Sequence, residues 1–261
     1  MTVQIVLVIL LFAAMVLTGR GRGLRAFVSL AADCAVLYLM LLIIAYGADP
    51  VAVTIGGSIA AAAVTLFYNG GFHRKTAAAL AAVALVIAAS LWLIWSLGVP
   101  EKTAGFGRQQ AETLSLLNLD VPLDFTRIAV AELLVGLLGS TMDVAVSIAS
   151  PVSEIAANQP YAGVGALFES GMRIGRDVLA TMVNTLVYVY VGESVTLMLW
   201  FGQYHISPAQ MWQDKLFATA LLQILTGGIA LVSVIPLTAA LTALLMRFHF
   251  ARYFPGLKPK A

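Results

Sequence analysis

Two carboxylates stand in an otherwise apolar stretch of this sequence, at Glu132 and Asp143. The eleven residues that separate them complete three helical turns and about 20°, so both side chains share one face of a helix. Ser147 and Ser150 continue that face with hydroxyl groups. A carboxyl group inside a membrane helix is typical of a proton or ion pathway. This face is therefore the first candidate for a functional site.

A second polar stripe follows on the next apolar stretch. Its members are Asp177, Thr181, Asn184 and Tyr188. Because the two stripes belong to consecutive, antiparallel helices, we expect them to pair, with Thr185 beside them. Asp33, on an earlier apolar stretch, is expected at the depth of Asp143 and Asn184, about 10 Å below the cytoplasmic boundary. These residues together form the predicted ion or substrate pathway.

Two interpretations of Asp143 stay open. A charge near the middle of a bilayer costs at least about 2.5 kcal/mol on insertion scales. Since this cost falls on the ionised form, a desolvated Asp143 would hold its proton and release it when a cavity opens, as a proton carrier requires. Alternatively, Asp143 hydrogen-bonds Asn184 or Thr185 and joins two helices, a contact worth about 0.6 kcal/mol in membranes.

The elements that position these residues are membrane-spanning helices. The chain has 261 residues, of which 61% are hydrophobic and 11% charged, and its mean hydropathy is +0.93. Apolar stretches near the roughly 20 residues that cross a bilayer recur along the whole chain. The sequence therefore predicts an all-α, polytopic membrane helix bundle, with residues 1–261 in a single transmembrane domain.

About seven spans are predicted. They are 3–18, 26–46, 51–68, 76–98, 128–150, 178–201 and 222–246. Four N-terminal helices thus occupy 1–98, an extracytoplasmic connection occupies 99–127, and three helices lie in 128–261. A second long connection is expected at 151–177, with Glu154 and Glu169 in it.

The basic residues indicate the orientation. Of the fifteen Lys and Arg residues, eleven fall on one side of the predicted spans and four on the other. The positive-inside rule then places the C-terminus in the cytoplasm and the N-terminus outside, in the cell membrane. Because these residues are spread over topological anchors, nucleic-acid binding is not expected.

The sequence gives little support for enzymatic chemistry. It has one cysteine, no nucleotide-binding glycine loop and no nucleophile elbow, and its three histidines have no spacing that suggests a metal site. We therefore expect no cofactor, no metal and no enzyme activity. An intramembrane aspartyl dyad of Asp143 and Asp177 is the one enzymatic alternative, although Asp177 should lie nearer the membrane boundary.

Two segments carry a family resemblance. They are LLGSTMDVAVSIASPVSEI and ESGMRIGRDVLATMVNTLVYVYVG. These segments resemble the YibE/F-like membrane protein family, and the similarity runs from Ala131 to Glu193 and on through GGIALVSVIPLTA. The resemblance implies a multipass membrane protein, which in bacteria is often accompanied by a related protein with an extracytoplasmic domain.

A more distant likeness concerns the mechanism. The helix of Asp143 and the helix that follows it look like the fourth and fifth helices of one half of the RND permeases, where the aspartate belongs to the proton relay. Here GADP stands where those proteins have a large porter domain. The likeness is an analogy that favours a proton-coupled role.

Two functions are therefore expected to compete. The first is a secondary permease or export subunit, coupled to a proton or cation through Asp143, with an unknown small molecule or ion as substrate. The second is a membrane scaffold that positions an extracytoplasmic partner protein. The expected partners are membrane lipids and either the related membrane protein or further copies of this chain.

Overall fold

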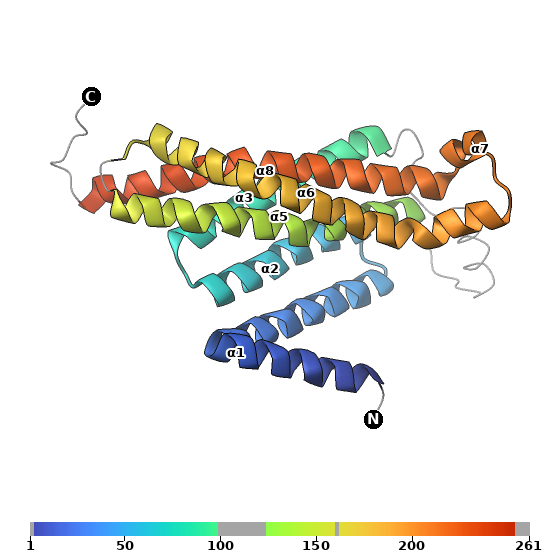
Figure 1. The fold of residues 1–261 in the computed structure, drawn as a ribbon, viewed down its shortest axis with the longest axis horizontal. Helices are drawn as coiled ribbons and strands as arrows, with labels where there is room; N and C mark the ends of the chain where they lie inside the picture. The colour runs from blue at the N-terminus through green and yellow to red at the C-terminus, as the bar shows by residue number, and fades with distance from the viewer. Residues whose placement is uncertain (1–2, 99–123, 160–161, 254–261) are drawn as a thin grey trace.

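The computed structural model describes residues 3–98, 124–159 and 162–253. In chain order its helices are α1 (Val3–Ala45), α2 (Pro50–Gly70), α3 (Arg74–Leu93), the π-helical turn η1 (Ile94–Gly98), α5 (Phe125–Asn158), α6 (Val164–Gln203), α7 (Pro208–Gln213) and α8 (Lys215–Tyr253). Six of these helices are long and apolar enough to cross a membrane. The predicted all-α bundle of membrane helices is confirmed at this level (Figure 1).

Helix α1 folds back on itself. Arg20 has φ 47° and ψ −126°, outside the helical region, and the chain reverses there (Figure 1). Gly23 allows the reversal because a Cβ at this position would overlap the carbonyl oxygen of Met15. The two arms, 3–19 and 21–45, correspond to the first two predicted spans, 3–18 and 26–46.

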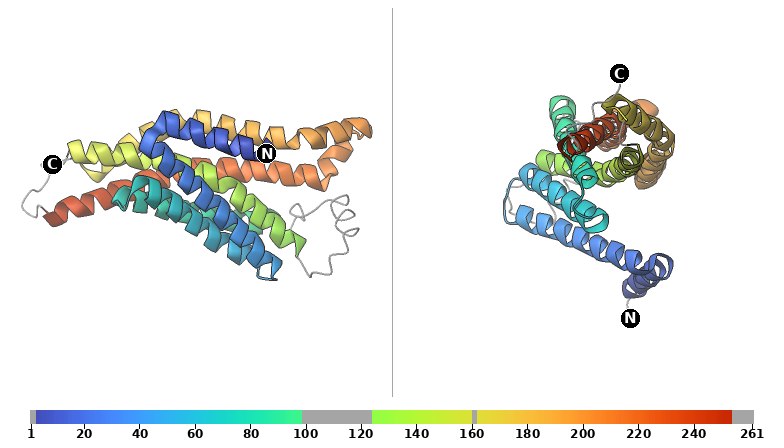
Figure 2. Two further views of the ribbon diagram at one scale, coloured as in Figure 1. Left: turned by 90° about the horizontal axis from the view of Figure 1, so that it is seen from below. Right: turned by 90° about the vertical axis from the view of Figure 1, so that its left-hand side faces the viewer.

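The core lies among α3, α5, α6 and α8. Helix α8 packs against the other three, and α5 also packs against α2. Leu134 of α5 and Leu231 and Val234 of α8 are fully buried there. Helix α1 packs mainly on α2, at the edge of the bundle (Figure 2), and only 11% of its most apolar window is buried, against 50% for α5.

The predicted long connection at 151–177 is wrong. Helix α5 continues through Pro151 to Asn158, and α6 begins at Val164. Proline removes one backbone hydrogen bond and normally ends a helix, but here the next turn is held by packing, because Val152 is fully buried. In membrane bundles, neighbouring helices offset the loss at such prolines.

The longer helices change where the candidate residues lie along them. Asp143 is fifteen residues before the end of α5, about 22 Å along the helix axis. Glu154 and Glu169, expected in a loop, lie instead on exposed helix surfaces of α5 and α6.

Candidate functional site

One face of α5 carries the predicted carboxylates. Glu132, Gly136, Gly139 and Asp143 are all exposed, while Ser147 and Ser150 further along the same face are partly exposed. Asp143 lies nine residues after the fully buried Leu134, which places it half a turn away, on the opposite side of the helix. The predicted common face of Glu132 and Asp143 is therefore present, and at Asp143 it points out of the described bundle.

Asp143 has an open setting within the described part of the chain. It makes no hydrogen bond or ion pair with another described residue. One turn away, a Cβ built on Gly139 would have nothing within 4 Å. Asp143 is therefore accessible from the outer surface of the bundle.

The polar stripe of α6 is exposed as well. Asn184 lies nine residues after Gly175, which is buried against Ile235 of α8, so it points away from the core. Thr181 Oγ1 donates to the carbonyl of Val178 at 2.8 Å. Thr185 Oγ1 donates to the carbonyl of Thr181 at 2.8 Å.

The two stripes do not pair within one chain. The hydroxyls of Thr181 and Thr185 both donate to backbone carbonyls of their own helix, a common arrangement inside helices. Among the described residues, Asn184 and Asp177 have no hydrogen-bond partner, and none of the stripe reaches Asp143. The roles predicted for these residues stay predictions.

Asp33 pairs with a residue of α2, whereas it was expected at the depth of Asp143 and Asn184 as part of the same pathway. Thr65 Oγ1 of α2 donates to Asp33 Oδ1 at 2.8 Å and to Oδ2 at 2.6 Å. One turn along the same interface, Asn69 Nδ2 donates to Ser29 Oγ at 3.1 Å. Asp33 thus joins α1 to α2 and is not brought together with Asp143.

A polar cluster joins α5, α6 and α8 around Gly136. Tyr190 is 5% exposed, and its hydroxyl and the Gln223 amide are hydrogen-bonded. A Cβ on Gly136 would lie 3.1 Å from Gln223 Nε2 and 3.4 Å from Tyr190 Oη. The carboxyl of Glu193 interacts electrostatically with Glu132 and with Tyr190.

Sequence reasoning did not find this cluster. Tyr190 lies two residues past the polar stripe of α6, on the buried side of that helix. Gln223 was the available signal, because a carboxamide in an apolar helix seeks a partner. Its partner could not be identified without knowing that α8 packs beside α5 and α6.

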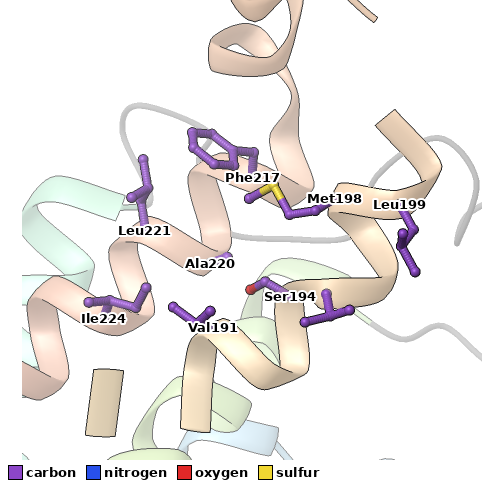
Figure 3. Close-up of a pocket in the computed structure, with 9 residues that line it drawn as sticks. Val191, Ser194, Met198, Leu199, Phe217, Ala220, Leu221 and Ile224 are labelled. Atoms are coloured by element: carbon purple, nitrogen blue, oxygen red, sulfur yellow. The ribbon is translucent and has the colours of Figure 1, made fainter. Parts of the chain in front are cut away.

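An apolar pocket lies between α6 and α8, next to this cluster (Figure 3). It has a volume of about 420 Å³ and is lined by Val191, Ser194, Val195, Met198, Leu199, Phe217, Ala220, Leu221 and Ile224. The hydroxyl of Ser194 donates to the carbonyl of Tyr190 at 2.8 Å. Because its polar atom is occupied, the pocket suits a hydrocarbon group.

The arrangement is suited to binding protons or cations. Glu132 and Asp143 are about 16 Å apart along the axis of α5, eleven residues at 1.5 Å each. A proton or cation held at either carboxyl removes the charge that the membrane disfavours. In the described residues there is no group of three His, Cys, Asp or Glu side chains that could hold a metal ion.

Comparison with families of known proteins gives a match. The family model described as YibE/F-like protein matches residues 7–248, most of the chain, which confirms the resemblance seen in the sequence. No curated protein and no solved structure matches.

Proposed function

This chain belongs to the YibE/F-like protein family, and we propose that it is a secondary permease or export subunit coupled to a proton or cation through Asp143. In this proposal Asp143, within the membrane, takes up the ion from one side of the membrane and releases it to the other side. Glu132 and its cluster lie toward the outer end of the same pathway. The substrate is an unidentified small molecule or ion.

The observation that carries the proposal is the setting of Asp143. It lies in the middle of a membrane-spanning helix, exposed and without a partner in the described chain. A carboxyl group that served as internal glue would be paired, as Asp33 is with Thr65. Placing an unpaired carboxyl in a membrane costs free energy, and residues of this kind commonly belong to ion pathways.

The proposal includes a topology. Both arms of α1 are taken as spans, which makes seven, with the N-terminus outside and the C-terminus in the cytoplasm of the cell membrane. Arg20, Arg22 and Arg25 at the reversal of α1 support this orientation, because basic residues favour the cytoplasmic side.

Proton flux into liposomes tests the proposed function. Reconstituted protein with an internal pH-sensitive dye should acidify the vesicles when a proton gradient is imposed. Asp143→Asn should reduce the flux to that of protein-free vesicles, because an amide cannot carry the proton. Glu154→Gln, a carboxyl on the same face nearer the end of α5, is the matched control and should retain the flux.

Two results would contradict the proposal. Flux in Asp143→Asn equal to the unsubstituted protein would remove Asp143 from the pathway. Equal losses of proton flux in Asp143→Asn and Glu154→Gln would show that the flux depends on the overall negative charge of this face of α5 and not on Asp143 itself.

A scaffold that positions an extracytoplasmic partner is the second candidate. The exposed, unpaired polar faces of α5 and α6 favour it, since a partner helix could supply the missing contacts. Under this alternative, Asp143→Asn would reduce copurification of the related membrane protein, and no protein-dependent proton flux would be measured in the unsubstituted chain.

A further inference from the structure

The exposed faces of α5 and α6 are incomplete as surfaces of a membrane protein. Asp143 on α5 and Asn184 on α6 are exposed and have no hydrogen-bond partner among the described residues. Lipid offers neither a donor for the carboxyl oxygens nor an acceptor for the amide, and each unsatisfied group costs free energy in hydrocarbon. A second protein surface in the membrane would supply both partners.

Asp143 and Asn184 lie at nearly the same depth. A Cβ on Gly175 of α6 would lie 3.4 Å from Ile148 Cδ1 of α5, and a Cβ on Gly171 would lie 3.2 Å from Val152 Cγ2. These contacts give the register of the two antiparallel helices. Asp143 lies five residues before Ile148 on α5. Because the helices are antiparallel, it is level with the residue five positions after Gly175 on α6, which is residue 180. Asn184 is four residues further along α6, so it lies within about one helical turn of the depth of Asp143.

The two faces are chemically complementary. The carboxyl of Asp143 accepts hydrogen bonds whether or not it is protonated, and the amide of Asn184 can donate them. Beside Asp143, Gly139 leaves open space, and small residues let membrane helices approach closely. A single chain thus carries both halves of a contact that it does not make itself.

We infer that these faces form a symmetric interface between two copies of the chain, in which Asp143 of one copy lies beside Asn184 of the other. A two-fold axis along the membrane normal keeps every residue at its depth, so two groups at one level meet across it. The contact then occurs twice in each dimer. The existence of this interface does not depend on transport. That the interface couples ion uptake by the two copies rests on the proposed function.

Cysteine cross-linking between two tagged copies tests the interface. In a Cys34→Ser background, one copy carries Val146→Cys on the exposed face of α5 and the other carries Thr181→Cys on α6. A short bismaleimide applied to membranes should join the two tags. Leu85→Cys, on the exposed surface of α3, replaces Thr181→Cys as the control and should not be joined.

Either of two outcomes would overturn the inference. One is the absence of an α5–α6 product between the tags. The other is a product equally strong with Leu85→Cys, because that would show random collision in the membrane.

Association of the copies gives a second measurement. In lipid nanodiscs, photobleaching of labelled chains should count two copies per particle. Asn184→Leu and Asp143→Leu should each weaken association about tenfold, since two contacts of about 0.6 kcal/mol are lost per dimer. Thr196→Leu, another exposed position on α6, should leave association unchanged.

The outcomes separate this inference from the proposed function. Single copies that conduct protons would overturn the interface and leave the permease proposal standing. Dimers without proton flux would support the interface and contradict the permease proposal.

Discussion

The polar residues discussed above fall into two groups: those with a hydrogen-bond partner within the chain and those with none among the described residues. Asp33 is held by Thr65, and Tyr190 by Gln223. Asp143 and Asn184 face outward without partners in the described chain. Residue type alone does not distinguish these groups, because Asp33 and Asp143 are both aspartates in apolar helices.

Thr65→Val tests the pairing of Asp33. The substitution removes both hydrogen bonds to a half-buried carboxyl, which should lower the free energy of unfolding by about 1 kcal/mol. Thermal unfolding in detergent, followed by fluorescence, measures the change. Thr196→Val, at an exposed position of α6, should leave the midpoint unchanged, and equal midpoints for both variants would contradict the assignment.

At the scale of helices, glycine sets how closely α6 approaches α8. A Cβ on Gly171 would lie 2.7 Å from Ala239 Cβ, and one on Gly175 would overlap Ile235. Both glycines are buried. Gly192, further along the same helix, is exposed with nothing within 4 Å of a built Cβ. The same residue type therefore serves packing at one end of α6 and has no contact at the other.

Gly175→Ala should destabilise the protein, and Gly192→Ala should not. Overpacking against Ile235 should cost about 1–3 kcal/mol in Gly175→Ala. Gly192→Ala should be neutral or stabilising by up to about 1 kcal/mol, because alanine favours the helix. Thermal unfolding midpoints of the two variants, each compared with that of the unsubstituted protein, measure these effects. A stabilised Gly175→Ala would mean that the two helices are further apart than described.

The element boundaries show where reading the sequence succeeds and fails. Helical spacing correctly placed Glu132 and Asp143 on one face, because that relation depends only on the geometry of a single helix. The end of α5 was predicted wrongly at Pro151, since the packing of Val152 outweighs the local preference of proline. The partners of Asp33 and Tyr190 depend on which helices are neighbours, and hydropathy carries no such information.

At the scale of the whole molecule, membrane sidedness can be tested at two exposed positions. Trp212 lies on α7, and Phe72 lies between α2 and α3; they are 65% and 88% exposed. In the proposed orientation they are on opposite sides. In a Cys34→Ser background, a membrane-impermeant maleimide should label Trp212→Cys in intact cells, and Phe72→Cys only after the membrane is opened.

An N-terminal epitope tag extends this measurement to the number of spans. If both arms of α1 cross the membrane, the tag should be accessible on intact cells, on the same side as Trp212→Cys. A tag that is protected while Trp212→Cys is labelled would show that α1 does not cross twice. The seven-span proposal would then be wrong, although the rest of the orientation would hold.

The central place of α8 has a consequence for how the protein is made. Helix α8 covers the inner faces of α3, α5 and α6, yet it is the last of these helices to leave the ribosome. Until then the earlier helices reside in the bilayer without their main contact. Assembly of the core must therefore follow synthesis of almost all the described chain, and a nascent chain stalled before Lys215 would present an open bundle to the proteases that survey the membrane.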